Sequence, residues 1–162
     1  MKKYSFVWTL AGLGLAVSMS LTALPSMATE HQHHGVNTVE LQLNAGQKWQ
    51  TDAPLRQAMR DIGAAVNSAY DAIHNNQLDA VGYEKLAAEV NQQVAYMIEN
   101  CELEPAADAQ LHIVIHRMLD SAQVMEKPSA IEEKREGAVQ LIGALESYAK
   151  YFSDADFIKP AH

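Results

Sequence analysis

The sequence predicts an all-α protein, an antiparallel up-down-up-down four-helix bundle with an N-terminal extended strap. Four successive segments carry apolar residues at alternating steps of four and three, which is the period of a helix with one buried face. Residues typical of helix starts and helix ends bound each segment. The connections between the segments are short, and short connections favour antiparallel neighbours.

Residues 1–28 have the pattern of a cleavable signal peptide. Lys2 and Lys3 precede an apolar run over residues 6–24, and residues 26–28 fit a cleavage site. An uncleaved membrane anchor is the alternative, but the small, glycine-containing apolar core and the cleavage triplet favour removal. We therefore expect a mature chain that begins at Thr29, lies in a bacterial periplasm and makes no membrane contact after cleavage.

The composition of the mature chain argues against a nucleic-acid partner. Without the leader, 134 of the 162 residues remain, and the basic count falls from 12 to 10 against 20 acidic residues, a net charge of −10. Such a charge disfavours contact with a phosphate backbone. The length predicts one domain with a core that needs no disulfides.

The chain has a single cysteine, Cys101. Exported proteins normally use cysteines in pairs, because their compartment is oxidising. Cys101 is therefore expected to be a buried spectator, an intermolecular disulfide partner or a metal ligand.

Residues 29–50 are predicted to form a histidine-containing tail followed by the strap. With Thr29 first, the α-amine, the backbone nitrogens of Glu30 and His31, and the His31 imidazole complete a square plane, which favours Cu(II) or Ni(II). His33 and His34 would take a second, weaker ion. The alternative is a polar linker whose histidines are incidental.

The strap is predicted from an alternation of apolar and polar residues. Val39, Leu41 and Leu43 alternate with polar side chains, which is the period of a half-buried extended segment. We expect this segment to lie across the helices without joining a sheet. Residues 44–46 then turn the chain, and Trp49 is expected to close one end of the core.

Helix start and stop signals define the first two helices. The first is predicted to have Asp52 or Thr51 as its N-cap and Pro54 in its first turn, and to end at Asn75-Asn76. Asp79 is the predicted cap of the second helix, whose apolar stripe ends at Cys101.

The third helix is predicted to run from Pro105 to about Met125, before Lys127-Pro128 stops it. Residues 129–132 read as a capping box that opens the fourth helix, which reaches Phe152. The bundle is thus expected over residues 51–153, with a C-terminal tail over residues 154–162.

The inward-facing residues share helical spacing within each segment. They are Leu55, Met59, Ile62, Val66, Ala69 and Ile73; Tyr83, Leu86, Val90, Val94, Met97 and Cys101; Leu111, Ile115, Met118 and Ala122; and Ile131, Ala138, Ile142, Leu145, Ala149 and Phe152.

A candidate metal site lies at the end of the bundle where the second helix passes into the third. Met59 and His112 stand at nearly equal depth, because each lies seven residues past the start of its helix. Met97 reaches a similar level, and Cys101 lies about one turn nearer the rim. A thiolate, an imidazole and a thioether suit copper, especially Cu(I), and zinc is the alternative.

Each member of this set also has a purely structural interpretation. Methionines in a helical stripe are usually core, and a free cysteine packs as a small hydrophobe. His112 can bond its backbone or Asp108, one turn earlier. His116, one turn after His112, is a further ligand candidate, although its neighbour Arg117 indicates that this face turns toward solvent.

Several enzyme classes lack their motifs. The chain has no Cys-x-x-Cys-His for covalent haem, no Glu-x-x-His on a predicted helix for a di-iron site, and no nucleophile elbow or phosphate loop. Non-covalent haem b between Met59 and a histidine stays open as an electron-transfer alternative.

Two sequence blocks resemble a known group of proteins. Residues 43–59 and residues 100–105, together with Asp108 and Leu111-His112, resemble small exported bacterial proteins labelled DnrO-like. The resemblance covers residues 39–152. Such proteins accompany heavy-metal and copper efflux systems, so the resemblance implies metal handling, with a metal-efflux component as partner.

We therefore expect a periplasmic copper-binding protein that buffers or passes Cu(I), with a role in metal homeostasis or heavy-metal resistance, and not an enzyme. The alternatives are the haem-binding bundle and a non-catalytic scaffold protein with a merely packed cysteine.

Overall fold

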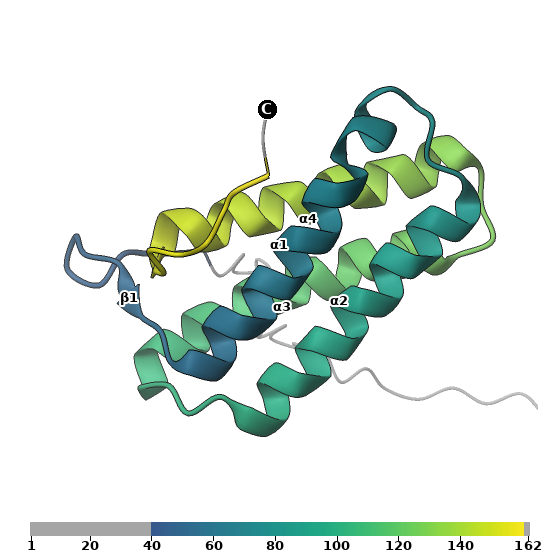
Figure 1. Cartoon of the computed structure of the whole chain (residues 1–162). Coiled ribbons are helices and arrows are strands. Elements are labelled where there is room, and N and C mark those ends of the chain that lie inside the picture. Colours follow the sequence, from purple (N-terminus) through teal and green to yellow (C-terminus); the bar gives the residue numbers. More distant parts are fainter. Residues whose placement is uncertain (1–39, 161–162) are drawn as a thin grey trace, which may run out of the picture. The chain divides into compact units, whose positions relative to one another are not determined.

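The computed structural model of the chain describes residues 40–160 and contains four helices (Figure 1). The helices are α1 (Ala53–His74), α2 (Ala80–Asn100), α3 (Pro105–Glu126) and α4 (Ile131–Tyr151). Two strands of two residues each flank them, β1 (Trp49–Gln50) and β2 (Phe152–Ser153). The predicted all-helical class and the four-helix bundle are confirmed. The predicted leader, the histidine tail and Val39 lie outside the described residues.

The helices begin where short-range signals predicted. Asp52 is the N-cap of α1, and its Oδ1 accepts the Leu55 N–H at 2.9 Å. Asp79 caps α2 in the same way, since its Oδ1 accepts the Gly82 N–H at 2.8 Å. Pro105 is the first residue of α3.

The predicted capping box of the fourth helix is wrong. Ala130 is the N-cap of α4 and makes no side-chain cap hydrogen bond. Ser129 lies one residue before the cap, and its buried Oγ has no hydrogen-bond partner among the described residues. The first turn of α4 instead carries Glu132 and Glu133, whose negative charges interact favourably with the positive N-terminal end of the helix dipole.

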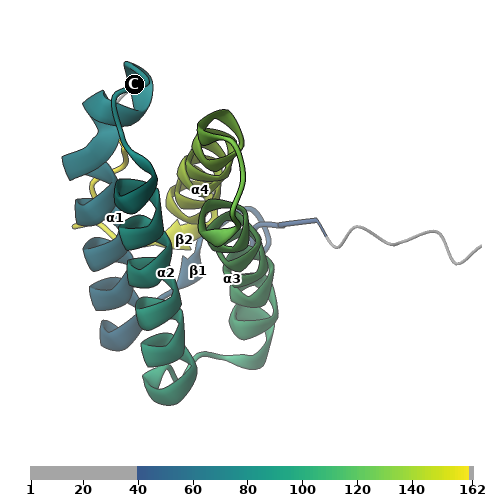
Figure 2. The same cartoon turned by 90° about the vertical axis from the view of Figure 1, so that its right-hand side faces the viewer.

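Consecutive helices pack against one another, and Figure 2 shows α1 beside α2 and α3 beside α4. Gly137 explains how closely α3 and α4 approach, because a Cβ there would stand 2.9 Å from the Ser121 carbonyl oxygen. The predicted inward faces are buried almost throughout. Ile131 is an exception, since it is 40% exposed at the very start of α4. The largest fully buried side chains are Tyr83, Tyr148, Phe152, Leu55, Met59, Ile62, Met97, Leu111, Met118, Met125, Leu141 and Leu145.

A short parallel strand pair joins the chain before α1 to the chain after α4. Trp49 pairs with Phe152 and Gln50 with Ser153. Thr51 Oγ1 donates to the Ser153 carbonyl at 2.7 Å, which extends the pairing. Residues 40–43 belong to neither strand, so the pairing begins later than the predicted strap. Phe152, expected as the last helical core residue, is buried from β2.

The chain after β2 folds back along α1, as its yellow trace in Figure 1 shows. The Tyr148 hydroxyl donates to Asp154 Oδ2 at 2.9 Å, which fixes the start of this segment. The Phe157 ring packs edge-on against the Tyr148 ring, with centroids 5.1 Å apart. The same ring lies against Gly63 of α1, since a Cβ added at this glycine would stand 3.0 Å from it. Residues 154–160 thus cover part of the core.

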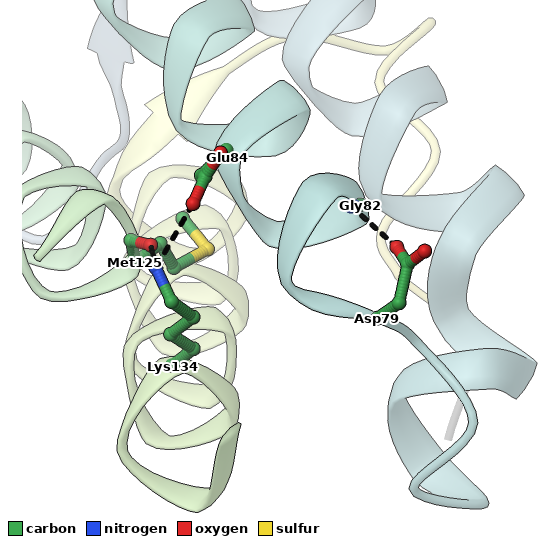
Figure 3. A network of polar contacts seen from close by, with 5 residues as sticks. All are labelled: Asp79, Gly82, Glu84, Met125 and Lys134. Carbon is green, nitrogen blue, oxygen red and sulfur yellow. Dashed lines mark hydrogen bonds and ion pairs between the residues drawn. The ribbon is translucent and has the colours of Figure 1, made fainter. Parts of the chain in front are cut away.

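The other end of the bundle contains a buried lysine. Lys134, in the first turn of α4, is 3% exposed, and its Nζ donates to the Met125 carbonyl in the last turn of α3 at 2.5 Å. The same Nζ lies 3.5 Å from Glu84 Oε1 in α2 (Figure 3). One ammonium therefore joins three helices.

Over residues 40–160, none of the helices has the length and apolarity needed to span a membrane.

Candidate metal centre

The candidate centre lies where the ends of several helices meet. Asp52 connects two of them, because its Oδ1 caps α1 while its Oδ2 accepts the Glu102 N–H just after α2, at 2.7 Å. Cys101 is the C-cap of α2, and its backbone N–H donates to the Met97 carbonyl at 2.9 Å. The start of α1 and the end of α2 are thus fixed together around the thiol.

The Cys101 thiol is half-buried and holds its proton firmly. Burial is the first cause that raises its pKa, from 9.0 to about 12, followed by the charge of Asp52, a hydrogen bond to Asp52, and the charge of Asp108. At neutral pH the side chain is therefore a thiol that donates to the Asp52 carboxylate. A metal bound here would have to displace that proton, since the thiolate is the ligand.

His112 lies on the exposed side of α3 and bonds its own helix. Its Nδ1 is 2.9 Å from the Asp108 carbonyl oxygen and 3.4 Å from Asp108 Oδ2. Asp108 therefore acts on both predicted ligands, through its charge on the Cys101 thiol and through direct contact with His112. The structural interpretation of His112, a bond to Asp108 or to the backbone, is observed.

The two methionines belong to the core. Met59 in α1 is 0% exposed and Met97 in α2 is 1% exposed. A thioether inside a packed core is not available to an ion from solvent. Either methionine could bind a metal only if this end of the bundle opened.

His116 is fully on the surface, with a side chain that is 77% exposed. Its Nδ1 lies 2.8 Å from Asp120 Oδ2, one turn later on α3. His74, at the last position of α1, stacks on the Tyr70 ring with centroids 6.2 Å apart.

No cluster of His, Cys, Asp and Glu side chains able to hold a metal ion is present in the part of the chain that the structure describes. Within residues 40–160, no three His, Cys, Asp or Glu side chains stand close enough together to hold one ion. The predicted tail ligands Thr29, Glu30, His31, His33 and His34 lie outside the described residues.

The donor chemistry of the predicted set nevertheless fits a soft ion. Thiolate, thioether and imidazole suit copper, whereas calcium and magnesium require oxygen ligands. The geometry adds two conditions, because the thiol at Cys101 carries a proton and the sulfurs of Met59 and Met97 are covered. Copper binding would thus be coupled to proton release and to a local rearrangement.

Two carboxylates that act on predicted ligands were not themselves predicted as part of the site. Asp52 was predicted only as a helix cap, and its bond to the residue after Cys101 joins positions far apart in the sequence. Asp120 was missed, although its spacing of one turn from His116 can be read from the sequence.

Comparison with protein-family models, with curated proteins and with solved structures finds no match for this chain. The resemblance to the DnrO-like proteins therefore stays a prediction.

Proposed function

We propose that this chain is an exported, periplasmic metal-binding protein that buffers or passes copper as Cu(I), and that it is not an enzyme. Its ligands would be Cys101 and His112, with Met59 or Met97 as thioether. The observation that carries the proposal is the position of Asp108, whose charge acts on the Cys101 thiol while its side chain lies 3.4 Å from His112 Nδ1. Asp108 thus acts on both donors, through its charge at Cys101 and through direct contact at His112.

The same carboxylates favour a cation. Burial is the largest cause that raises the pKa of the Cys101 thiol, and Asp52 and Asp108 raise it further, because a thiolate beside them would be repelled. Cu(I) carries the single positive charge of the proton that it replaces, so the exchange leaves the local charge unchanged. The negative charges of Asp52 and Asp108 beside the Cys101 sulfur should therefore also favour a bound monovalent soft cation.

The bundle topology that supports this site is an up-down-up-down arrangement of antiparallel helices with the N-terminal segment laid across it. The short connections and the packing of α1 on α2, α2 on α3 and α3 on α4 support this topology. The segment from Leu41 also makes the expected kind of contact, since the Gln42 N–H donates to Gln110 Oε1 of α3 at 2.7 Å.

Two further parts of the proposal rest on the sequence. The histidine tail would hold Cu(II) through Thr29, Glu30 and His31 once the leader is removed. A component of a metal-efflux system would be the protein partner, as the resemblance implies.

Competition with a Cu(I) chelator tests the proposed site. The native protein is expected to bind Cu(I) more tightly than Cys101→Ser, in which the oxygen is a poor ligand for a soft ion. Met59→Leu should also weaken binding, whereas Met125→Leu should not. Both substitutions replace fully buried methionines with a side chain of similar volume, and Met125 lies near Lys134 at the other end.

Two outcomes would replace the proposal. Equal affinity in the native protein and Cys101→Ser would make Cys101 a packed residue of a scaffold protein. A Soret band on addition of haem, lost in Met59→Ala, would favour the electron-transfer alternative.

A further inference from the structure

Four polar residues form an exposed stripe on α3. Asp108, His112, His116 and Asp120 follow one another at intervals of one helical turn. The two histidine side chains are 67% and 77% exposed, and those of Asp108 and Asp120 are 48% and 60% exposed. His112 and His116 therefore follow each other on one face, four residues or about 6 Å apart along the axis, with an aspartate one turn beyond each of them.

The hydrogen bonds of the stripe orient both rings. His112 Nδ1 donates to the Asp108 carbonyl oxygen at 2.9 Å, with the carboxylate Oδ2 of the same residue at 3.4 Å. His116 Nδ1 lies 2.8 Å from Asp120 Oδ2 and donates to it. A neutral imidazole whose Nδ1 carries the proton has its lone pair on Nε2. Both rings thus have the tautomer of metal-binding histidines, whose other nitrogen bonds a carboxylate or carbonyl.

We infer that His112 and His116 form a two-imidazole chelate for a borderline divalent cation, Cu²⁺ or Zn²⁺, on the exposed face of α3. The two Nε2 atoms would be the protein ligands, and water would complete the coordination. Asp108 and Asp120 orient the rings, and their two negative charges balance the charge of the ion. No core methionine is needed, so this site forms without rearrangement of the bundle.

The neighbouring cation does not compete for this position. Arg117 follows His116 directly, but its Nη1 lies 3.3 Å from Ser147 Oγ of α4, so its guanidinium is drawn toward the next helix. The affinity of nitrogen sites for divalent ions rises to copper and falls again at zinc. Cu²⁺ should therefore bind more tightly than Zn²⁺.

This site goes beyond the proposed Cu(I) function and shares only His112 with it. The thiol site takes a soft monovalent ion, whereas the imidazole pair takes a divalent one. A protein with both would bind copper in either oxidation state.

Titration with Zn²⁺ alone, followed by ¹H–¹⁵N spectra of the imidazole rings, tests the chelate. The protein would carry His31→Gln, His33→Gln and His34→Gln, which removes the tail ligands. At one equivalent, the Nε2 resonances of His112 and His116 should shift together while those of His74 stay in place. Shifts confined to one ring, or to Nδ1, would overturn the inference.

Matched variants give a second readout. His116→Gln should lose Zn²⁺ binding, and His74→Gln should bind as its parent does. Asp120→Ala should bind about 10–100-fold more weakly, as is usual when the residue that orients a ligand is removed. Because all three side chains are exposed, circular dichroism should be unchanged. Native affinity in His116→Gln would contradict the chelate.

The two sites fail separately. Cys101→Ser should bind Cu(I) more weakly and keep Zn²⁺ binding, whereas His116→Gln should keep Cu(I) binding and lose Zn²⁺ binding. A negative Zn²⁺ result would therefore contradict the imidazole chelate alone, and a negative Cu(I) result would contradict the thiol site alone.

Discussion

At the Lys134 end of the bundle a charged side chain is buried and hydrogen-bonded, whereas at the other end the Cys101 thiol is half-buried and the His112 imidazole is exposed. Lys134 is bonded to the Met125 carbonyl and lies near Glu84, so its ammonium has partners on two other helices. Cys101 has a proton that its carboxylate neighbours retain, and His112 presents one nitrogen to solvent. The first end thus holds three helices together, whereas the second carries the groups that the proposed copper site would use.

Removal of Lys134 should have the largest effect on stability. Lys134→Ala leaves the Met125 carbonyl without its donor and opens a cavity, so the free energy of unfolding should fall by about 2–4 kcal/mol. Urea denaturation measures this change, with Lys85→Ala on the exposed face of α2 as the control. Lys134→Met keeps much of the volume and should lose about 1–3 kcal/mol, the cost of the unsatisfied carbonyl. If Lys134→Met had the same free energy of unfolding as the native protein, the buried ammonium would not be needed for stability.

Two glycines of α4 should respond in opposite directions. Gly137→Ala places a Cβ 2.9 Å from the Ser121 carbonyl oxygen and should cost about 1–3 kcal/mol. Gly143→Ala meets nothing within 4 Å and should stabilise the helix by up to about 1 kcal/mol. Thermal unfolding of the two variants measures both effects. Equal changes in stability for Gly137→Ala and Gly143→Ala would contradict the close approach of α3 and α4 at Gly137.

The charge of Asp52 should control the reactivity of Cys101. Asp52→Asn keeps a good helix cap but removes the negative charge beside the thiol, so the pKa of Cys101 should fall below its native value of about 12. It should stay above 9.0, because burial remains the largest cause. The rate of alkylation as a function of pH measures this pKa. An unchanged profile would show that Asp52 does not reach the thiol.

The raised thiol pKa also makes stability depend on pH. Folding raises this pKa from 9.0 to about 12, so the folded state holds the proton more tightly than the unfolded state does. The resulting stabilisation is complete below pH 9 and is lost as the pH rises toward 12. Between these values the native protein should therefore lose more stability than Cys101→Ser. If the free energies of unfolding of the two proteins fell in parallel between pH 9 and pH 12, the raised pKa of the Cys101 thiol would be contradicted.

A change in the N-terminal tail should affect Cu(II) binding without affecting the fold. One extra residue before Thr29 would move His31 out of third place, which would destroy the proposed four-nitrogen plane. The visible d–d band of the Cu(II) plane should disappear, while Cu(I) binding and the melting temperature stay the same. Identical Cu(II) spectra for both forms would reduce the tail to a linker.

Features that depend on neighbouring residues could be predicted from the sequence. The caps Asp52 and Asp79 and the start at Pro105 follow from local hydrogen bonds and a fixed φ angle, and the contact of His112 with Asp108 follows from helical spacing. The predicted cap of α4 failed because the helix begins at Ile131, so the N-cap position falls on Ala130 and Ser129 lies one residue too early.

Features that depend on distant parts of the chain were missed. The pairing of Trp49 with Phe152 and the bond of Asp52 to Glu102 join segments that no local pattern connects. The burial of Lys134 opposes the usual position of lysine at the surface, and only its partners on other helices explain it.

Proton release on Cu(I) binding is the measurement that tests the central claim most directly. Because Cys101 is a protonated thiol and the ligand must be a thiolate, the native protein at pH 8 should release about one proton for each Cu(I) bound. Cys101→Ser should release none and bind more weakly. Cu(I) binding without proton release, or the same release from Cys101→Ser, would show that the thiol is not the ligand.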